Sequence, residues 1–350
     1  MRRAFFAAIA AAAIAALPVF AEEAAVDLDG ASAELLSPIA GTDGPLRLRG
    51  LGHGLYALEN AASGERFASI LLEGTVLASA GGRRSVAAER AEAWRVADDL
   101  GLSAEGLAVD DRGDRLSLTA AKFAWRPAPA ELAVEAEAEG LALDYDLASG
   151  RMRLSADGLA GSALPVGEST AALAWRAGPA GIDVETGDGA ESATIALGDV
   201  RVSLTDGLAA ELRSATLAWE DGGPMSLAIE GLAFSQPLLD ILLPSPGLEP
   251  PPMRLEAIFA GDGAGTRLER LVLQAGAARV EAEGRLPARD GGQGLVLEVR
   301  ATGLAELLAA AGATHPEALL AARGIPASGE ARFSLTNGPD GLVVQPAGSR

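Results

Sequence analysis

Side chains that could carry out acid–base, nucleophilic or metal chemistry are few in this chain. It has no cysteine, and its two histidines are His53 and His315. A zinc site needs several converging ligands, and a catalytic nucleophile needs a nearby base that is itself held in place. Neither histidine has a second candidate of its own type beside it in the sequence. We therefore predict no metal site and no histidine-based catalytic site.

Carboxylates gather in two short clusters, which are Asp110, Asp111 and Asp114 in the first and Asp183, Glu185 and Asp188 in the second. A calcium loop needs a fuller alternating set of oxygen ligands with a closing acid, and a glycosidase needs two carboxylates across a cleft. The spacings show neither arrangement, so aspartates that form turns are the preferred interpretation. Serine-elbow and phosphate-loop motifs are also missing, and we predict a non-enzymatic protein without a cofactor.

Four tryptophans share one setting, near the end of an alternating run and before a charged residue: Trp94, Trp125, Trp175 and Trp219. One interpretation is packing at the edge of a core, with the indole N–H in contact with water. The other is a row of indoles that lines one wall of a groove for an apolar ligand. Both interpretations stay open on sequence alone.

Alternation of apolar and polar residues dominates the chain from about residue 64. In the stretch GLVLEVRATGLAELLAAAG at 294–312, Leu295, Leu297 and Val299 fall on one side of an expected strand, and a helix-like run follows. These three residues are further candidates for lining a groove. Most other runs carry charges on one face, and glycine-rich turns separate them, which indicates antiparallel strands.

The predicted fold is mainly β: an elongated, curved antiparallel sheet, as a β-groove or an open sandwich, with a few short helices chiefly near the C-terminus. A sheet with one apolar face must cover that face or leave a groove. In 114–125 the alternation changes phase before Phe123, which predicts a bulge or bend. The tripeptide Gly-Leu-Ala is expected where strands give way to turns, at 106, 140, 158, 207, 231 and 303.

Helices are expected where the strand pattern breaks. Ser235 precedes an apolar run at 236–243, and a second run occupies 303–312. A third helix is predicted from a capping box of Thr314 and Glu317, with Gly324 closing it. We expect these helices to cover the apolar face at an end or a kink of the sheet.

The first 21 residues have the three parts of a signal peptide, with Arg2 and Arg3 before an apolar run and cleavage expected after Ala21. An uncleaved membrane anchor is the alternative, although the run is short and contains Pro18. After cleavage no other stretch is long enough for a stable membrane span. The expected location is the periplasm.

The formal net charge is −20 and basic residues form no block, so nucleic acid is not an expected partner. In the segment 243–252, LPSPGLEPPP, prolines recur densely. This segment is either an internal domain boundary or a rigid crossover within one sheet. We favour a crossover, and thus one elongated β-rich domain at 22–350.

The segment TRLERLVLQAGAARVEAEGRLPARDGGQGLVLEVRATGLAELLAAAG resembles the repeat style of AsmA-like proteins of the cell envelope. The exported, alanine-rich chain, with its Trp-Arg strands and its closing GEARFSLTNGPDGLVV, also looks like the alphaproteobacterial DUF2125 family, a domain of unknown function. The resemblance implies a curved antiparallel sheet with an apolar inner groove, in the periplasm. It implies no catalytic residues.

Taken together, these features predict a non-enzymatic, envelope-associated periplasmic protein that binds a lipid or another apolar ligand along a β-sheet groove. The alternative is a structural or interaction protein, whose sandwich is closed by its own second layer and which meets a protein partner of the envelope. A hydrolase that uses acidic residues is a distant third hypothesis. The sequence does not identify the ligand.

Overall fold

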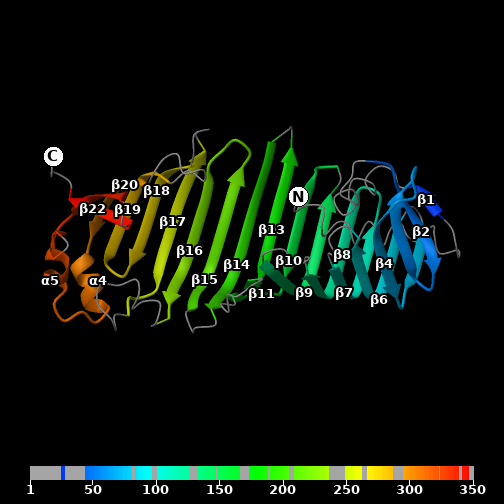
Figure 1. Cartoon of the computed structure of the whole chain (residues 1–350), viewed down its shortest axis with the longest axis horizontal. Helices are drawn as coiled ribbons and strands as arrows, with labels where there is room; N and C mark the ends of the chain where they lie inside the picture. Colours follow the sequence, from blue (N-terminus) through cyan, green and yellow to red (C-terminus); the bar gives the residue numbers. More distant parts are fainter. Residues whose placement is uncertain are drawn as a thin grey trace. The chain divides into compact units, whose positions relative to one another are not determined.

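Figure 1 shows a computed structural model of the chain. It describes residues 25–27, 44–80, 83–96, 101–126, 132–146, 148–165, 173–187, 190–204, 209–235, 249–261, 266–286, 295–322, 324–338 and 341–346. The chain divides into two compact units, Met1–Asp188 (unit 1) and Gly189–Arg350 (unit 2). The division does not fall at 243–252, the segment that is either an internal boundary or a crossover on sequence grounds. The expected signal peptide at 1–21 lies outside the described residues.

Unit 1 is built from antiparallel strands, which are β1 (Ala25–Asp27), β2 (Leu46–Gly52), β3 (Leu55–Asn60), β4 (Arg66–Glu73), β5 (Val76–Ala80), β6 (Arg83–Arg95), β7 (Gly101–Asp111), β8 (Arg115–Arg126), β9 (Leu132–Asp146), β10 (Arg151–Ala156), β11 (Gly158–Pro165), β12 (Leu173–Ala177) and β13 (Ala180–Gly187). Strands β4 and β5 lie end to end along β6. In the same way, β10 and β11 lie end to end along β9. Each such pair is therefore one long strand with a break in the middle.

The long strands of unit 1 change phase at one level of the sheet. In β8, Leu118 and Ala120 are buried, two exposed residues follow, and Phe123 is buried again. This confirms the phase change predicted for 114–125. The register between β7 and β8 is the same on both sides of the change, so both strands shift together. Both halves of each strand thus keep their apolar residues on the same face.

Glycines with a left-handed backbone lie at this level in every second strand. Gly74, Gly106 and Gly140 have φ of 62°, 61° and 59°. A Cβ on Gly140 would lie 2.1 Å from an oxygen of Asp157 on the neighbouring strand segment. Gly106 and Gly140 begin Gly-Leu-Ala tripeptides, and at these two positions the tripeptide marks a kink inside a strand, which corrects the expected place at strand ends. Gly303 follows the end of β20 as expected, and residue 207 lies outside the described residues. The kink returns the following leucine, such as Leu107, to the core.

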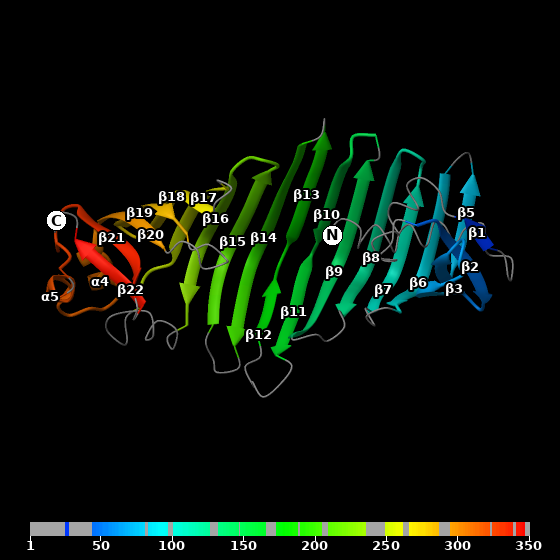
Figure 2. The same cartoon turned by 45° about the horizontal axis from the view of Figure 1, so that its top comes forward.

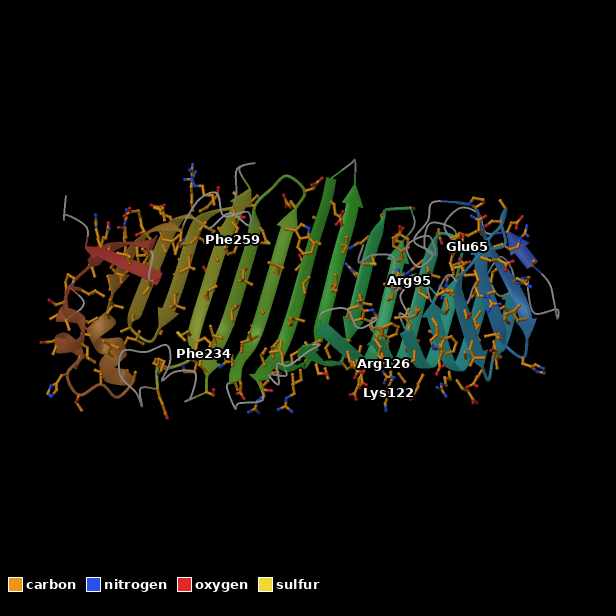
Figure 3. All side chains as sticks on the ribbon, viewed as in Figure 1. Glu65, Arg95, Lys122, Arg126, Phe234 and Phe259 are labelled. Atoms are coloured by element: carbon orange, nitrogen blue, oxygen red, sulfur yellow. The ribbon has the colours of Figure 1, made fainter. Side chains whose placement is uncertain are left out.

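Charges of alternating sign lie directly opposite one another along the same level. They are, from β4 to β9, Glu73, Arg90, Glu105, Lys122 and Glu139. Lys122 points away from the sheet in Figure 3. Opposite charges across neighbouring strands contribute roughly 0.2–1 kcal/mol each. We therefore expect the row to support the sheet where the kink interrupts its regular pairing.

The inner face of unit 1 is filled by its own side chains. Leucines from several strands are at most 1% exposed, namely Leu46, Leu48, Leu58, Leu107 and Leu143. Alanine and valine fill the spaces between them, as at Ala104 and Val109. Burial of this extent is typical of a close-packed protein interior.

Unit 2 continues with β14 (Ala190–Leu204), β15 (Ala209–Glu220), β16 (Met225–Phe234), β17 (Met253–Gly261), β18 (Thr266–Ala275), β19 (Ala278–Arg285), β20 (Val296–Thr302), β21 (Ala331–Gly338) and β22 (Gly341–Pro346). Each strand pairs antiparallel with the next in the chain. Figure 2 shows β14, β15 and β16 as long neighbouring strands. The predicted class, mainly β and antiparallel with short helices near the C-terminus, is confirmed.

Two short helices, α4 (Leu304–Ala310) and α5 (Pro316–Ala321), follow β20. Leu308, Ala311 and Leu320 form their common core, against which residues of the helices and adjoining loops pack. Gly303, at the start of α4, lies so close to the β18–β19 turn that a Cβ would be 2.6 Å from the Ala277 carbonyl oxygen. The helices therefore pack on each other beside a strand end, and the residues that pack against their core come from the helices and adjoining loops.

The predicted capping box of Thr314 and Glu317 is wrong. His315 is the N-cap of α5 and makes no side-chain cap hydrogen bond. Its carbonyl oxygen accepts the hydrogen bond of Leu319 N at 3.2 Å, because Pro316 occupies the first helical position. Gly324, with φ of 67°, follows the end of α5 as predicted. The helix expected at 236–243 lies outside the described residues.

Candidate functional site

The inward sides of β14, β15 and β16 carry apolar side chains in register across the strands. This surface, called the apolar face, comprises Ala193, Ile195, Leu197, Val200, Val202, Ala210, Leu212, Ala215, Leu217, Trp219, Met225, Leu227, Ile229, Leu232 and Phe234. Residues directly opposite on paired strands share a face and lie about 5 Å apart. Charged residues on the same strands, such as Arg201, Arg213 and Glu230, alternate with these positions and are exposed.

Two residues with positive φ keep the face apolar on both sides of a kink. Asp199 in β14 has φ of 47°, and Gly231 in β16 has φ of 69°. Arg213 lies between them on β15. A Cβ added to Gly231 would lie 3.0 Å from the Cβ of Arg213. Beyond the kink, Val200 and Leu212 are paired and continue the face. Because of this phase change, Arg213 points outward and its neighbour Leu212 points inward.

Side chains of the apolar face are much less buried than the equivalent residues of unit 1. Among its members, Ala193 is buried, Met225 is 37% exposed, and the others are half-buried. In unit 1, Leu116 and Leu118 hold the same kind of position on β8 and are each 3% exposed. The described part of unit 2 thus leaves a wholly apolar surface only partly covered.

Farther along the sheet, the same side of unit 2 becomes closed. Ala257, Leu268, Ala282 and Val299 form a buried cluster on β17 to β20. Leu297 packs against it, and Leu295 is half-buried just before β20. The predicted common side of Leu295, Leu297 and Val299 is therefore present, and it belongs to this cluster, against which Leu227 and Phe259 also pack.

The tryptophans do not form one row. Trp125 and Trp175 lie inward in unit 1, on one cross-strand row with Ala136 and Gly161 between them. Trp94 is 37% exposed and points outward, because the phase change in β6 turns its neighbour Ala93 inward. Trp94 is therefore not a lining residue.

Trp219 is the tryptophan that lies on the apolar face, in unit 2. It is directly opposite Met225, which is itself opposite Phe259 on β17. Sequence analysis did not single out Met225 or Phe259. The alternating run at 224–234 contained the signal for Met225, but the partner strand that aligns Phe259 with it could be identified only from the pairing.

Described members of the carboxylate clusters act as turn and ion-pair groups, and Asp188 lies outside the described residues. A hydrogen bond from Arg151, with help from Arg153, lowers the pKa of Asp183. A hydrogen bond from Arg83 likewise lowers the pKa of Asp110. Asp111 accepts a hydrogen bond from the backbone N–H of Gly113 at 2.8 Å, as a turn aspartate does. Among the described residues, no group of these side chains is arranged to hold a metal ion.

His53 lies exposed at the tip of the β2–β3 hairpin with φ of 52°, between two glycines that also have positive φ. His315 is exposed at the start of α5. Within the described ranges, no helix is long and apolar enough to cross a membrane.

Comparison with known proteins adds no relative to this picture. No family model, curated protein or solved structure matches the chain. The resemblance to AsmA-like proteins and to the DUF2125 family therefore stays a prediction.

Proposed function

We propose that this protein is a non-enzymatic periplasmic binding protein of the cell envelope, which takes a lipid acyl chain or a similar apolar ligand on the apolar face of unit 2. The observation that carries the proposal is the contrast in burial. Leucines of unit 1 such as Leu58 and Leu143 are sealed in a core, whereas Leu217, Leu227 and their neighbours in unit 2 are only half-buried.

The chemistry of the face favours a hydrocarbon occupant. Each square ångström of apolar surface removed from water contributes about 25 cal/mol. Burying an unpaired charge against such a surface is strongly unfavourable, and the face offers no charged partner among its members. Exposed charges on these strands, such as Arg213, point to the other side. An acyl chain therefore fits this surface better than a charged solute does.

The experiment compares two glutamate substitutions on β15. Leu217→Glu places a carboxylate at the centre of the apolar face, opposite Ile195 and Leu227. Thr216→Glu places the same group on the outward side of the same strand, where the residue is exposed. Titration with a dansyl-labelled fatty acid should show binding to the parent protein and to Thr216→Glu, and at least about tenfold weaker binding to Leu217→Glu.

Native mass spectrometry of the protein purified from a periplasmic extract adds an independent readout. Lipid masses that leave on mild activation support the proposal. A parent protein that binds neither the labelled fatty acid nor extracted lipid would overturn it, as would equal loss of binding in both variants. Circular dichroism verifies that each variant keeps its β structure.

A structural role with a protein partner in the envelope is the second candidate. The filled interior of unit 1 favours it, because leucines such as Leu58, Leu107 and Leu143 are already buried among their own neighbours there. Crosslinking in whole cells tests this role. If the role is structural, crosslinking should capture a protein partner through unit 1, and the purified protein should carry no lipid.

A further inference from the structure

We propose that the cross-strand row of Trp219, Met225 and Phe259 is the specificity-determining end of the apolar face, where the methyl end of a bound acyl chain lies. This inference rests on the proposed function. Trp219 is directly opposite Met225, and Met225 is directly opposite Phe259. With neighbouring strands about 4.8 Å apart, the three side chains span about 10 Å across the sheet.

Side-chain size distinguishes this row from the rest of the face. Across β14, β15 and β16, the next row consists of Ile195, Leu217 and Leu227, and the one after it of Leu197, Ala215 and Ile229. Two aromatic rings and a thioether thus gather at one end, where a chain lying along the strands would meet them. Met225, 37% exposed, is the most accessible of the three.

Charge sets the orientation of the ligand. The turn next to this row begins with Glu220 and Asp221, which are both exposed, and Asp221 N donates a hydrogen bond to the Glu191 carbonyl oxygen at 2.6 Å. These carboxylates repel an anionic headgroup. At the other end of β14 and β15, Arg201 pairs with Glu211 at 3.0 Å, so charge is balanced there.

The two ends of the face are separated by the length of a strand. Phe259 lies at one end of β17 and Phe234 at the opposite end of β16 (Figure 3). A chain that extends from the Phe234 end therefore stops against the Trp219 row. Its headgroup lies away from Glu220 and Asp221, whether the chain belongs to a free fatty acid or to a phospholipid.

The first experiment measures a chain-length profile with dodecanoic, hexadecanoic and docosanoic acid as competitors of the dansyl-labelled fatty acid. Trp219→Ala removes the end of the face and should improve binding of docosanoic relative to hexadecanoic acid by about tenfold. Trp94→Ala, on the outward side of unit 1, should leave the profile unchanged. Should Trp219→Ala fail to fold, Met225→Ala replaces it, because that side chain is more exposed.

The second experiment measures orientation by fluorescence quenching. The emission that depends on Trp219 is the difference between the parent protein and Trp219→Phe. A fatty acid brominated near its methyl end should quench this emission, and one brominated near its carboxyl end should not. Repeating both arms with phospholipid vesicles shows whether the chain is taken from a bilayer or from free fatty acid.

The outcomes separate the two proposals. If the parent protein binds none of the acids, the proposed function fails and this inference fails with it. If the acids bind but the profile is the same in parent protein and Trp219→Ala, or if bromine near the carboxyl end quenches more strongly, the row is not the end of the site. The proposed function then stands without it.

Discussion

Gly161 on β11 and Trp175 on β12 form a matched pair in which the indole occupies the space that a side chain would need. A Cβ at Gly161 would lie 2.3 Å from Cζ2 of Trp175 and 2.7 Å from the Glu135 carbonyl oxygen. The backbone oxygen cannot move away as a flexible side chain could. We therefore expect Gly161→Ala to lower the free energy of unfolding by about 1–3 kcal/mol, measured by urea denaturation.

Gly181→Ala is the matched control, because its Cβ would meet its nearest atom, the Leu154 carbonyl oxygen, at an ordinary 3.8 Å. Equal stability of the two variants would show that the indole does not require Gly161. Sequence could not reveal this pair. The spacing of Gly161 and Trp175 carries no signal, and the requirement arises only from the register between two strands.

Strand pairing between β10 and β13 includes a pH-sensitive contact. Arg151 and Arg153 both bond to Asp183, at 2.7 and 3.2 Å, and the pKa of Asp183 is lowered chiefly by the hydrogen bond from Arg151. A carboxyl with a lowered pKa in the folded state stabilises the fold above its ordinary pKa of 3.8, and this contribution is lost as pH falls through the lowered value.

We therefore expect Asp183→Asn to lower the melting temperature at pH near neutrality and to have little effect in strong acid. The loss stays below about 1 kcal/mol because the pair is partly exposed. Thermal denaturation of both proteins across a pH series measures it. A difference that grows as pH falls would contradict the expected sign.

The row of opposite charges in unit 1 makes another prediction at this scale. Lys122 lies opposite Glu105 on one side and Glu139 on the other. Lys122→Glu would place three carboxylates side by side and should lower the free energy of unfolding by about 1 kcal/mol at low salt. High salt should reduce the loss, and Lys122→Arg should be neutral. A loss that does not depend on salt would rule out the electrostatic explanation.

Alternation was enough to predict most strands of this chain, since each half-strand keeps the period of two. The phase change at Phe123 was also visible, because it interrupts an otherwise regular run. The start of α5 was misplaced because Thr314 and Glu317 fit a capping pattern one residue too early for Pro316. Local patterns thus identified the strands and helices. Which of two neighbouring residues is the N-cap of α5, Thr314 or His315, follows only from the backbone conformation.

The extent to which each apolar face is covered could not be predicted, because Leu, Val and Ala alternate in the same way in both units. We expect Leu143→Ala in unit 1 to cost about 2–5 kcal/mol, since its side chain is 1% exposed. Leu217→Ala in unit 2 should cost about 1 kcal/mol, since less of its surface is buried.

Hydrogen exchange followed by mass spectrometry measures both losses locally, in peptides from β8 and β9 for the first and from β15 and β16 for the second. Equal losses at the two sites would mean that Leu217 is covered as completely as Leu143. That result would remove the observation on which the proposed binding face depends.

The shared level of the kinks also limits how this chain can change length during evolution. Losing one residue from half of a strand would move the apolar side chains in the rest of that half to the outer face. It would also disrupt the register with both neighbouring strands. Gaining a whole hairpin that carries its own kink would preserve every register. Insertions and deletions in homologous chains should therefore fall in the turns or comprise complete hairpins, so that related proteins differ in their number of strands more readily than in the length of any one strand.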